Sequence, residues 1–120
     1  MFSLSSWRVR GQVTTVSSMT TLVQDNPDLN RYEVFEGGEL AGFSEYTRSA
    51  GTIAVTHTEV DDRFEGRGLG SALARGVLDA AREDGLAVLP QCPFTAGYIR
   101  NHRDDYLDLV PEDKRSRFGL

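Results

Sequence analysis

Hydrophobic and polar positions alternate with a period of two through most of the first half of the chain. Arg31–Glu36 (RYEVFE) is the clearest case, and Gly37-Gly38 separates it from a second such run at residues 39–48. Residues 20–24 precede these two runs, and Thr52–Val60, which is rich in β-branched residues, follows them. Turn-forming residues separate the segments, so the pattern predicts four strands in an antiparallel meander.

The hydrophobic period changes after residue 68. Leu69, Leu73 and Val77 recur at three-to-four spacing, which predicts a helix over residues 68–84 with one apolar stripe. The sequence then predicts a short buried strand at residues 86–89, a second helix at 95–102 and a last strand at 105–110 (DYLDLV). Because strand–helix–strand connections are right-handed, residues 86–89 should lie parallel to Thr52–Val60. The fold class is therefore α/β (α+β), a mixed sheet in which β-α-β-α-β follows the antiparallel meander.

Residues 1–18 show no clear period and are rich in serine and threonine. They lack the basic region followed by an apolar region that marks a secretory signal. We expect them to be a disordered extension or the product of a misassigned start codon, with a short strand through residues 12–16 as the alternative. Residues 19–120 are expected to form a single domain.

Composition excludes several classes of protein. The formal net charge is −5, which disfavours binding to nucleic acid through its phosphates. No apolar run approaches the length of a membrane span. The single cysteine, Cys92, rules out an intrachain disulfide and a multi-cysteine zinc site. We therefore expect a cytoplasmic protein with no metal and no membrane or nucleic-acid partner.

The stretch EGRGLGSAL, residues 65–73, places three glycines at the mouth of the predicted helix. Glycines there allow successive backbone N–H groups to converge on an anion without a Cβ in the way. A P-loop would require Gly-Lys-Ser/Thr, which is absent from the sequence, and a dinucleotide fingerprint fits the spacing poorly. A purely structural turn is the alternative to an anion site.

Several motifs together resemble the GNAT superfamily of acetyl-CoA-dependent N-acetyltransferases, and its short single-domain branch most closely. They are the glycine motif with its following Ser-Ala-Leu, THTEV at residues 56–60, PQC at 90–92, and Tyr98 with His102 and Tyr106. The resemblance covers residues 19–110. It implies acetyl-CoA as cofactor, CoA as product, and splayed fourth and fifth strands.

The resemblance also implies which backbone groups hold the cofactor. The pyrophosphate is expected on the amides of Gly66, Arg67, Gly68, Leu69, Gly70 and Ser71. An amide among Glu59, Val60 and Asp61 is expected to bind the acetyl oxygen. Glu65 departs from the family pattern, which has Gln or Arg at that position, so we expect Arg67 or Arg63 to supply the cation.

His57 and Glu59 are two apart in the fourth strand and should share its inward face with Ile53 and Val55. Either could take the proton from an amine, and a structural histidine and a strand-end acid are the alternative. Cys92 follows the fifth strand, where its thiolate could carry the acetyl group or the side chain could simply pack. Direct attack by the amine is the preferred route.

Three residues near the second helix complete the candidate site. By resemblance, Tyr98 is expected to protonate the CoA sulfur, and core packing is the alternative. Asn101 and His102 are expected to touch the pantetheine or the ribose phosphate. The predicted function is acetyl transfer to an amine, either a small molecule or a protein lysine, by a monomer or homodimer. A non-catalytic CoA-binding or interaction module is the alternative.

Overall fold

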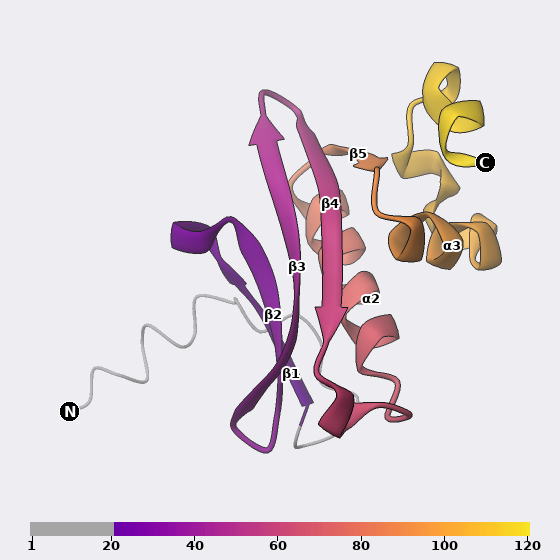
Figure 1. Ribbon diagram of the computed structural model, residues 1–120. Coiled ribbons are helices and arrows are strands. Elements are labelled where there is room, and N and C mark those ends of the chain that lie inside the picture. Colours follow the sequence, from indigo (N-terminus) through magenta and orange to yellow (C-terminus); the bar gives the residue numbers. More distant parts are fainter. Residues whose placement is uncertain (1–20) are drawn as a thin grey trace.

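A computed structural model describes residues 21–120, so the predictions made for residues 1–18 lie outside the described part of the chain. Within it, a single mixed sheet runs in the order β1-β2-β3-β4-β5 (Figure 1). The strands are β1 (Thr21–Asn26), β2 (Arg31–Glu36), β3 (Glu39–Ser49), β4 (Thr52–Val60) and β5 (Ala87–Pro90). Neighbouring strands are antiparallel except β4 and β5, which are parallel. The predicted fold class and strand directions are confirmed.

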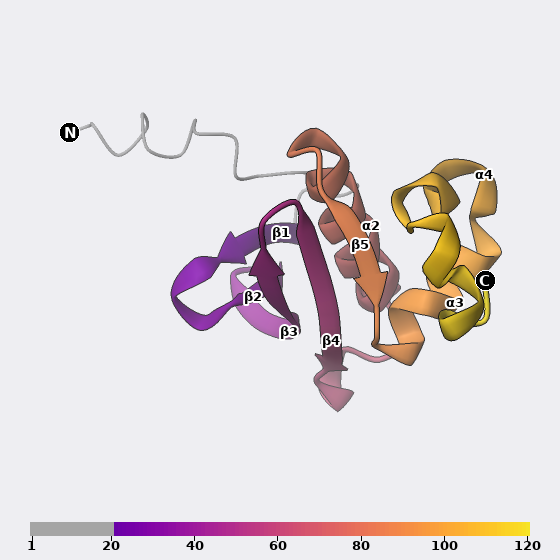
Figure 2. The same cartoon turned by 90° about the horizontal axis from the view of Figure 1, so that it is seen from above.

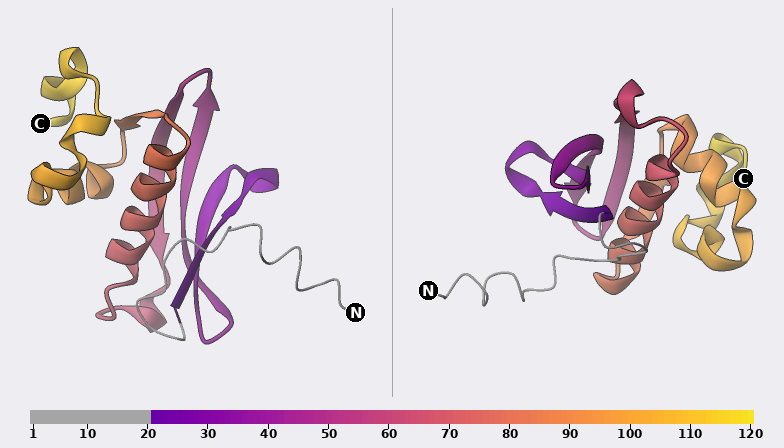
Figure 3. Two further views of the ribbon diagram at one scale, coloured as in Figure 1. Left: turned by 180° about the vertical axis from the view of Figure 1, so that it is seen from behind. Right: turned by 90° about the horizontal axis from the view of Figure 1, so that it is seen from below.

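The main helix, α2 (Leu69–Glu83), crosses one face of the sheet (Figure 3). The opposite face of β2–β4 has no helix drawn across it among the described residues (Figure 1). The remaining helices lie beyond β5 (Figure 2). They are α3 (Pro93–Asn101), α4 (Arg103–Tyr106) and the 3₁₀ turns Leu107–Leu109 and Glu112–Phe118; two further 3₁₀ turns are Pro27–Leu29 and Asp62–Phe64.

The hydrophobic core lies between α2 and the sheet. Leu69, Leu73, Val77 and Ala81 form the apolar stripe of α2 and are almost fully buried. Their partners include inward-facing side chains of the strands and of the C-terminal helices, among them Val34, Ile53, Val88, Ile99 and Val110. The helical spacing read from the sequence therefore predicted which face of α2 is buried.

The predicted last strand at residues 105–110 is wrong, because these residues continue α4 into a 3₁₀ turn. The alternation in DYLDLV also fits a helix, because Tyr106 and Val110 are four apart and both are buried in the core. A local hydrogen bond from Val110 N–H to Leu107 O, 3.0 Å long, closes the turn.

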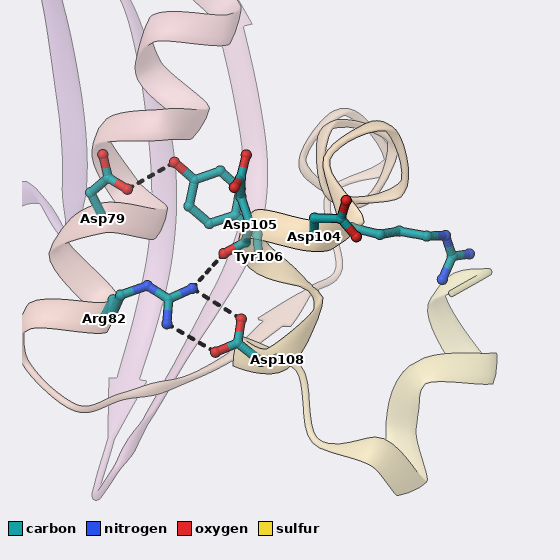
Figure 4. Close-up of a pocket in the computed structure, with 7 residues that line it drawn as sticks. Asp79, Arg82, Asp104, Asp105, Tyr106 and Asp108 are labelled. Carbon is teal, nitrogen blue, oxygen red and sulfur yellow. Dashed lines mark hydrogen bonds and ion pairs between the residues drawn. The ribbon is translucent and has the colours of Figure 1, made fainter.

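Polar contacts attach these C-terminal turns to α2. The Tyr106 hydroxyl donates to Asp79 at 2.8 Å, and Arg82 forms two hydrogen bonds to Asp108 at 2.9 and 3.0 Å (Figure 4). Burial and the bond to Asp79 raise the pKa of Tyr106. A polar cavity of about 490 Å³ lies between these groups, with Asp104 and Asp105 on its wall. The site described below lies elsewhere, at the N-terminus of α2.

Replacing Leu73 by alanine tests this core. Leu73 is fully buried, so Leu73→Ala should lower the free energy of unfolding by about 2–5 kcal/mol. Leu29→Ala is the control, because Leu29 is 55% exposed and should change the free energy by less than about 0.5 kcal/mol. Urea unfolding monitored by circular dichroism measures both free energies. Equal losses of unfolding free energy in the two variants would contradict the placement of Leu73 in the core.

Candidate functional site

The glycine-rich loop forms one wall of a groove of about 270 Å³ between the end of β4 and the start of α3. The groove is lined by Val60, Phe64, Glu65, Gly66, Gly68, Leu69, Gly70, Ser71 and Phe94. The structure thus brings together most of the residues expected to hold the cofactor. Arg67 belongs to the same loop without lining the groove.

Two features of the loop require glycine. Gly66 and Gly68 have φ angles of 82° and 73°, in the left-handed region that residues with a Cβ rarely adopt, and Gly68 is the N-cap of α2. A Cβ on Gly70 would lie 2.9 Å from the end of the Phe94 ring. The loop backbone and the Phe94 ring therefore stand close together across the first turn of the helix.

Within residues 21–120, the first N–H groups of α2 have no hydrogen-bond acceptor. The first bond of the helix runs from Ala72 N–H to Gly68 O, at 3.0 Å. Among residues 21–120, no acceptor lies in hydrogen-bond range of the N–H groups of Leu69, Gly70 and Ser71, and no acid occupies the first turn. These donors and the positive end of the helix dipole suit an anion.

Two arginines flank this loop, and each already has an acidic partner. Arg67 Nη1 lies 3.6 Å from Glu36 Oε2, and Arg63 Nε lies 3.4 Å from Asp61 Oδ1. The backbone N–H of Arg63 donates to the Asp61 carboxylate, and the Arg63 side chain does so as well. Both bonds, the first more than the second, lower the pKa of that carboxyl. Both guanidinium groups also lie over the Phe64 ring, with Arg63 at 5.1 Å and Arg67 at 5.5 Å from its centroid. The loop therefore holds two cations close to the bare helix end.

β4 and β5 separate before β4 reaches the groove at Val60. Their pairing ends with Val55 and Pro90, and one further bond from Cys92 N–H to Val55 O, 2.8 Å long, closes the gap. Residues 56–60 of β4 continue without β5. The Asp61 N–H donates to Ala41 O on β3 at 2.8 Å. Since N–H directions alternate along a strand, the Val60 N–H points the other way, toward the free edge.

The prediction that His57 and Glu59 face inward is wrong. Their side chains are 51% and 61% exposed and lie 2.8 Å apart on the open face of the sheet. The cause is a β-bulge: Tyr46 pairs with Val55 but Glu45 pairs with His57, so Thr56 is an extra residue in β4. One inserted residue moves every later side chain to the opposite face.

The same shift turns Thr58 inward, toward Cys92. The Thr58 hydroxyl lies 3.3 Å from Cys92 Sγ and 2.6 Å from the hydroxyl of Ser44, which is buried on β3. Reasoning from the sequence missed both hydroxyl residues, because nothing in the residue pattern reveals a bulge at Thr56. Ser44 and Thr58 pair across β3 and β4, and this pairing would identify both residues, but it can be read only once the register of the two strands is known.

Cys92 lies at the N-terminus of α3 and is 3% exposed. Burial raises the pKa of its thiol. The thiol donates to the Thr58 hydroxyl at 3.3 Å. Its interactions with Thr58 and, to a smaller extent, with Thr95 and Phe94 lower the pKa of Cys92, which is below its usual value.

Tyr98, Asn101 and His102 do not line the groove. Tyr98 interacts with Arg75 on α2 and raises the pKa of that guanidinium. The Tyr98 ring stacks on His102 with centroids 4.1 Å apart, and His102 Nδ1 lies 2.8 Å from Tyr98 O. Asn101 and His102 are exposed at the end of α3. These three residues form a cluster of their own on the side of α3.

Two further findings concern residues 21–120 alone. No group of three or more histidine, cysteine or acidic side chains there is arranged to hold a metal ion. The helices of this part of the chain are all too short or too polar to cross a membrane.

A mixed sheet whose parallel pair β4 and β5 splits, with a glycine loop leading into the main helix beside the split, defines this chain as an α/β domain. The family model "GCN5-related N-acetyl-transferase" matches residues 31–109, which is most of the chain. The chain belongs to this family of acetyltransferases.

The similarity to individual proteins covers less of the chain or is lower in sequence identity. Protein NATD1 of Xenopus tropicalis is 33% identical over 60 residues, which are 49% of this chain and 55% of that protein. The chain thus matches about half the length of this relative. The crystal structure of Ard1 from Thermoplasma volcanium is similar with a TM-score of 0.46 and 22% identity, over 72% of this chain and 65% of that one.

Gly42 offers a test of the β3–β4 contact beside Val60. A Cβ there would lie 2.5 Å from the backbone oxygen of Glu59, which cannot rotate away. Gly42→Ala should therefore lower the free energy of unfolding by about 1–3 kcal/mol.

Gly97→Ala is the matched control, because its Cβ would meet nothing closer than the flexible end of Arg100, at 3.7 Å. In the middle of α3, this change should stabilise the protein by about 0.5–1 kcal/mol. Thermal unfolding compares the two variants. Similar Tm values for both would show that β3 and β4 are less closely packed at this point.

Proposed function

We propose that this protein is an acetyl-CoA-dependent N-acetyltransferase that transfers the acetyl group to an amine. The observation that carries the proposal is the bare N-terminus of α2, which opens into a groove beside the split between β4 and β5. A diphosphate suits the N–H donors there, and the groove leads from them past Val60 toward the free edge of β4.

The backbone N–H groups and the apolar lining of the groove suit CoA, while Glu65 places one acid in the same lining. The amides of residues 66–71 would hold the diphosphate, and Arg67 and Arg63 would add positive charge. Val60 and Phe94 would form apolar walls for the pantetheine arm. When bound, acetyl-CoA supplies an activated acetyl group as a thioester. The Val60 N–H, which points toward the free edge, would then donate to the acetyl oxygen and polarise the carbonyl.

The acceptor amine must arrive neutral and must lose a proton during transfer. Glu59 and His57 form a hydrogen-bonded pair on the open face at the end of β4, where an acceptor approaching from that face would meet them. Glu59 is the candidate proton acceptor, with His57 as its partner. The net charge of −5 favours a cationic acceptor, either a small amine or a protein lysine.

A non-catalytic CoA-binding module is the second candidate. The observation that favours it is the position of Tyr98, which does not line the groove and stacks on His102 instead. Binding of CoA without release of its thiol in the presence of amines would distinguish this module from the enzyme.

Ligand binding is the first test. At one hundred times the dissociation constant, a ligand of the folded state adds about 2.7 kcal/mol, which should raise Tm by about 10 °C. We expect CoA and acetyl-CoA to produce this rise and ADP and NAD to produce less, because only the first two carry the pantetheine arm. If neither form of CoA raises Tm, the proposed function is wrong.

The role of the helix amides can be tested at Ser71. Proline in the first turn removes an N–H that the helix itself does not use, so Ser71→Pro should fold and should bind CoA about tenfold or more weakly. Ser71→Ala keeps the N–H and is the matched control. Isothermal titration calorimetry measures both affinities, and equal weakening would point to the hydroxyl instead of the amide.

Turnover is tested by release of free CoA thiol from acetyl-CoA with a panel of polyamines and lysine peptides. Glu59→Gln should lower kcat by about 10²–10⁴-fold if Glu59 takes the proton. Glu83→Gln, at an exposed acid of α2, is the control and should leave kcat unchanged. An unaltered kcat in Glu59→Gln would remove Glu59 from the mechanism.

A further inference from the structure

We propose that a pocket on the open face of the sheet, lined by Leu40, Phe43, Glu59 and Asp61, binds the acceptor and selects a primary amine at the end of an unbranched aliphatic chain. This inference rests on the proposed function and deepens it by naming the acceptor site and the class of its ligand. Three observations carry it: the position of the pocket beside the coenzyme groove, its apolar wall and the charges around it.

The pocket and the coenzyme groove lie on opposite sides of the same end of β4. The pocket has a volume of about 170 Å³, and Ala41 and Gly42 complete its lining. Glu59 lines the pocket, whereas the next residue, Val60, lines the groove. Since consecutive side chains of a strand point to opposite faces, an amine beside Glu59 needs to pass only the free edge of β4 to reach a thioester in the groove.

The wall of the pocket that β3 forms is apolar. Leu40 is 41% exposed, and among residues 21–120 the other exposed large hydrophobic side chains are Leu29 and Phe94. Phe94 lines the coenzyme groove, so two of these three side chains belong to the two sites on either side of β4. Phe43 lies opposite Glu59 across the two strands and continues the wall. Methylene groups packed against Leu40 and Phe43 would remove apolar surface from water, which favours a ligand with an aliphatic chain.

Acidic side chains surround the pocket. Glu59 and Asp61 line it, and Glu45 projects from the same face of the sheet in the neighbouring row, opposite His57. Within the described part of the chain, the Glu45 carboxylate has no ion-pair partner, and Glu59 pairs with His57 alone. A carboxylate on the ligand would be repelled here, whereas an ammonium group would be attracted.

Two arginines contact residues of the pocket without cancelling this charge. Arg31 forms an ion pair with Glu33 at 2.8 Å, and Arg63 lies 3.4 Å from Asp61, so each arginine is matched by an acid of its own. Glu45 and Glu59 remain without an arginine or lysine partner among residues 21–120.

The wall and the charges together define the ligand. The amine lies beside Glu59, and its chain runs across the pocket along Leu40 and Phe43. The small volume of the pocket favours a straight chain over a branched or aromatic amine. The Phe43 ring already contacts one cation, because the Arg31 guanidinium lies over it at 4.5 Å from the centroid. A lysine side chain and a linear diamine share this chemistry.

Nuclear magnetic resonance locates the binding site without any need for turnover. 1,5-Diaminopentane is titrated into the ¹⁵N-labelled protein in the presence of excess CoA, and backbone amide shifts should concentrate at residues 40–43 and 59–61. 5-Aminopentanoate, which carries a carboxylate in place of one terminal amine, should bind about tenfold or more weakly. Shifts that are absent, or that concentrate in the polar cavity beside Asp79, Asp104 and Asp105, would overturn the pocket.

The wall of the pocket is tested at Leu40 with a matched control. Leu40→Arg places a cation at the pocket, and Leu29→Arg makes the same change of charge at an exposed leucine outside it. Leu40→Arg should weaken binding of the diamine and raise its KM about tenfold or more, while the affinity for CoA stays the same. Leu29→Arg should behave as the wild type. Equal affinity for the diamine in Leu40→Arg and in the wild type would overturn the pocket.

Acetyl transfer separates this inference from the proposed function. The diamine and a capped peptide with one lysine should compete for the same pocket, and the higher kcat/KM of the two identifies the source of the amine. If amines are acetylated with a KM that Leu40→Arg does not change, the pocket is overturned while the proposed function stands. If the diamine binds at the pocket and no amine is acetylated, the proposed function fails and the acceptor role fails with it.

Discussion

The site depends on the unequal length of two parallel strands. β5 ends at Pro90, whereas β4 continues from Val55 to Val60 with a backbone edge that β5 does not cover. Parallel strands need a crossover, and here the crossover is α2, whose N-terminus begins a short loop after that same edge. One constraint thus places a free strand edge, a bare helix end and the start of α3 around a single groove. Family membership and fold agree with this arrangement.

Much of the fold could be predicted because each segment has one dominant period. The alternation of Arg31–Glu36 fits only a strand, and the spacing of Leu69, Leu73 and Val77 fits only a helix. Residues 105–110 fit both periods, and their structure was decided by long-range packing of Tyr106 against Asp79 on α2. A sequence pattern alone does not contain that contact.

The site was predictable where the backbone provides the chemistry and less so where side chains do. Glycines before a helix identify the loop, since their conformations and the absence of a Cβ have a direct physical meaning. The prediction that His57 and Glu59 face inward was wrong because a single inserted residue, Thr56, reverses the alternation of side chains after it. The same insertion brings Thr58 to Cys92, a contact that depends on the register of β3 against β4.

The open face of the sheet can change in sequence without a large change in stability. Phe43, Glu45, His57 and Glu59 project from β3 and β4 on the side opposite α2, and no helix of residues 21–120 is drawn across them (Figure 1). Exposed positions of this kind tolerate substitution with little loss of folding free energy. The residues of that surface can therefore change while the core and the groove at the start of α2 keep their sequence. A small scaffold of this design is a convenient starting point for engineering an exposed surface without disturbing the fold.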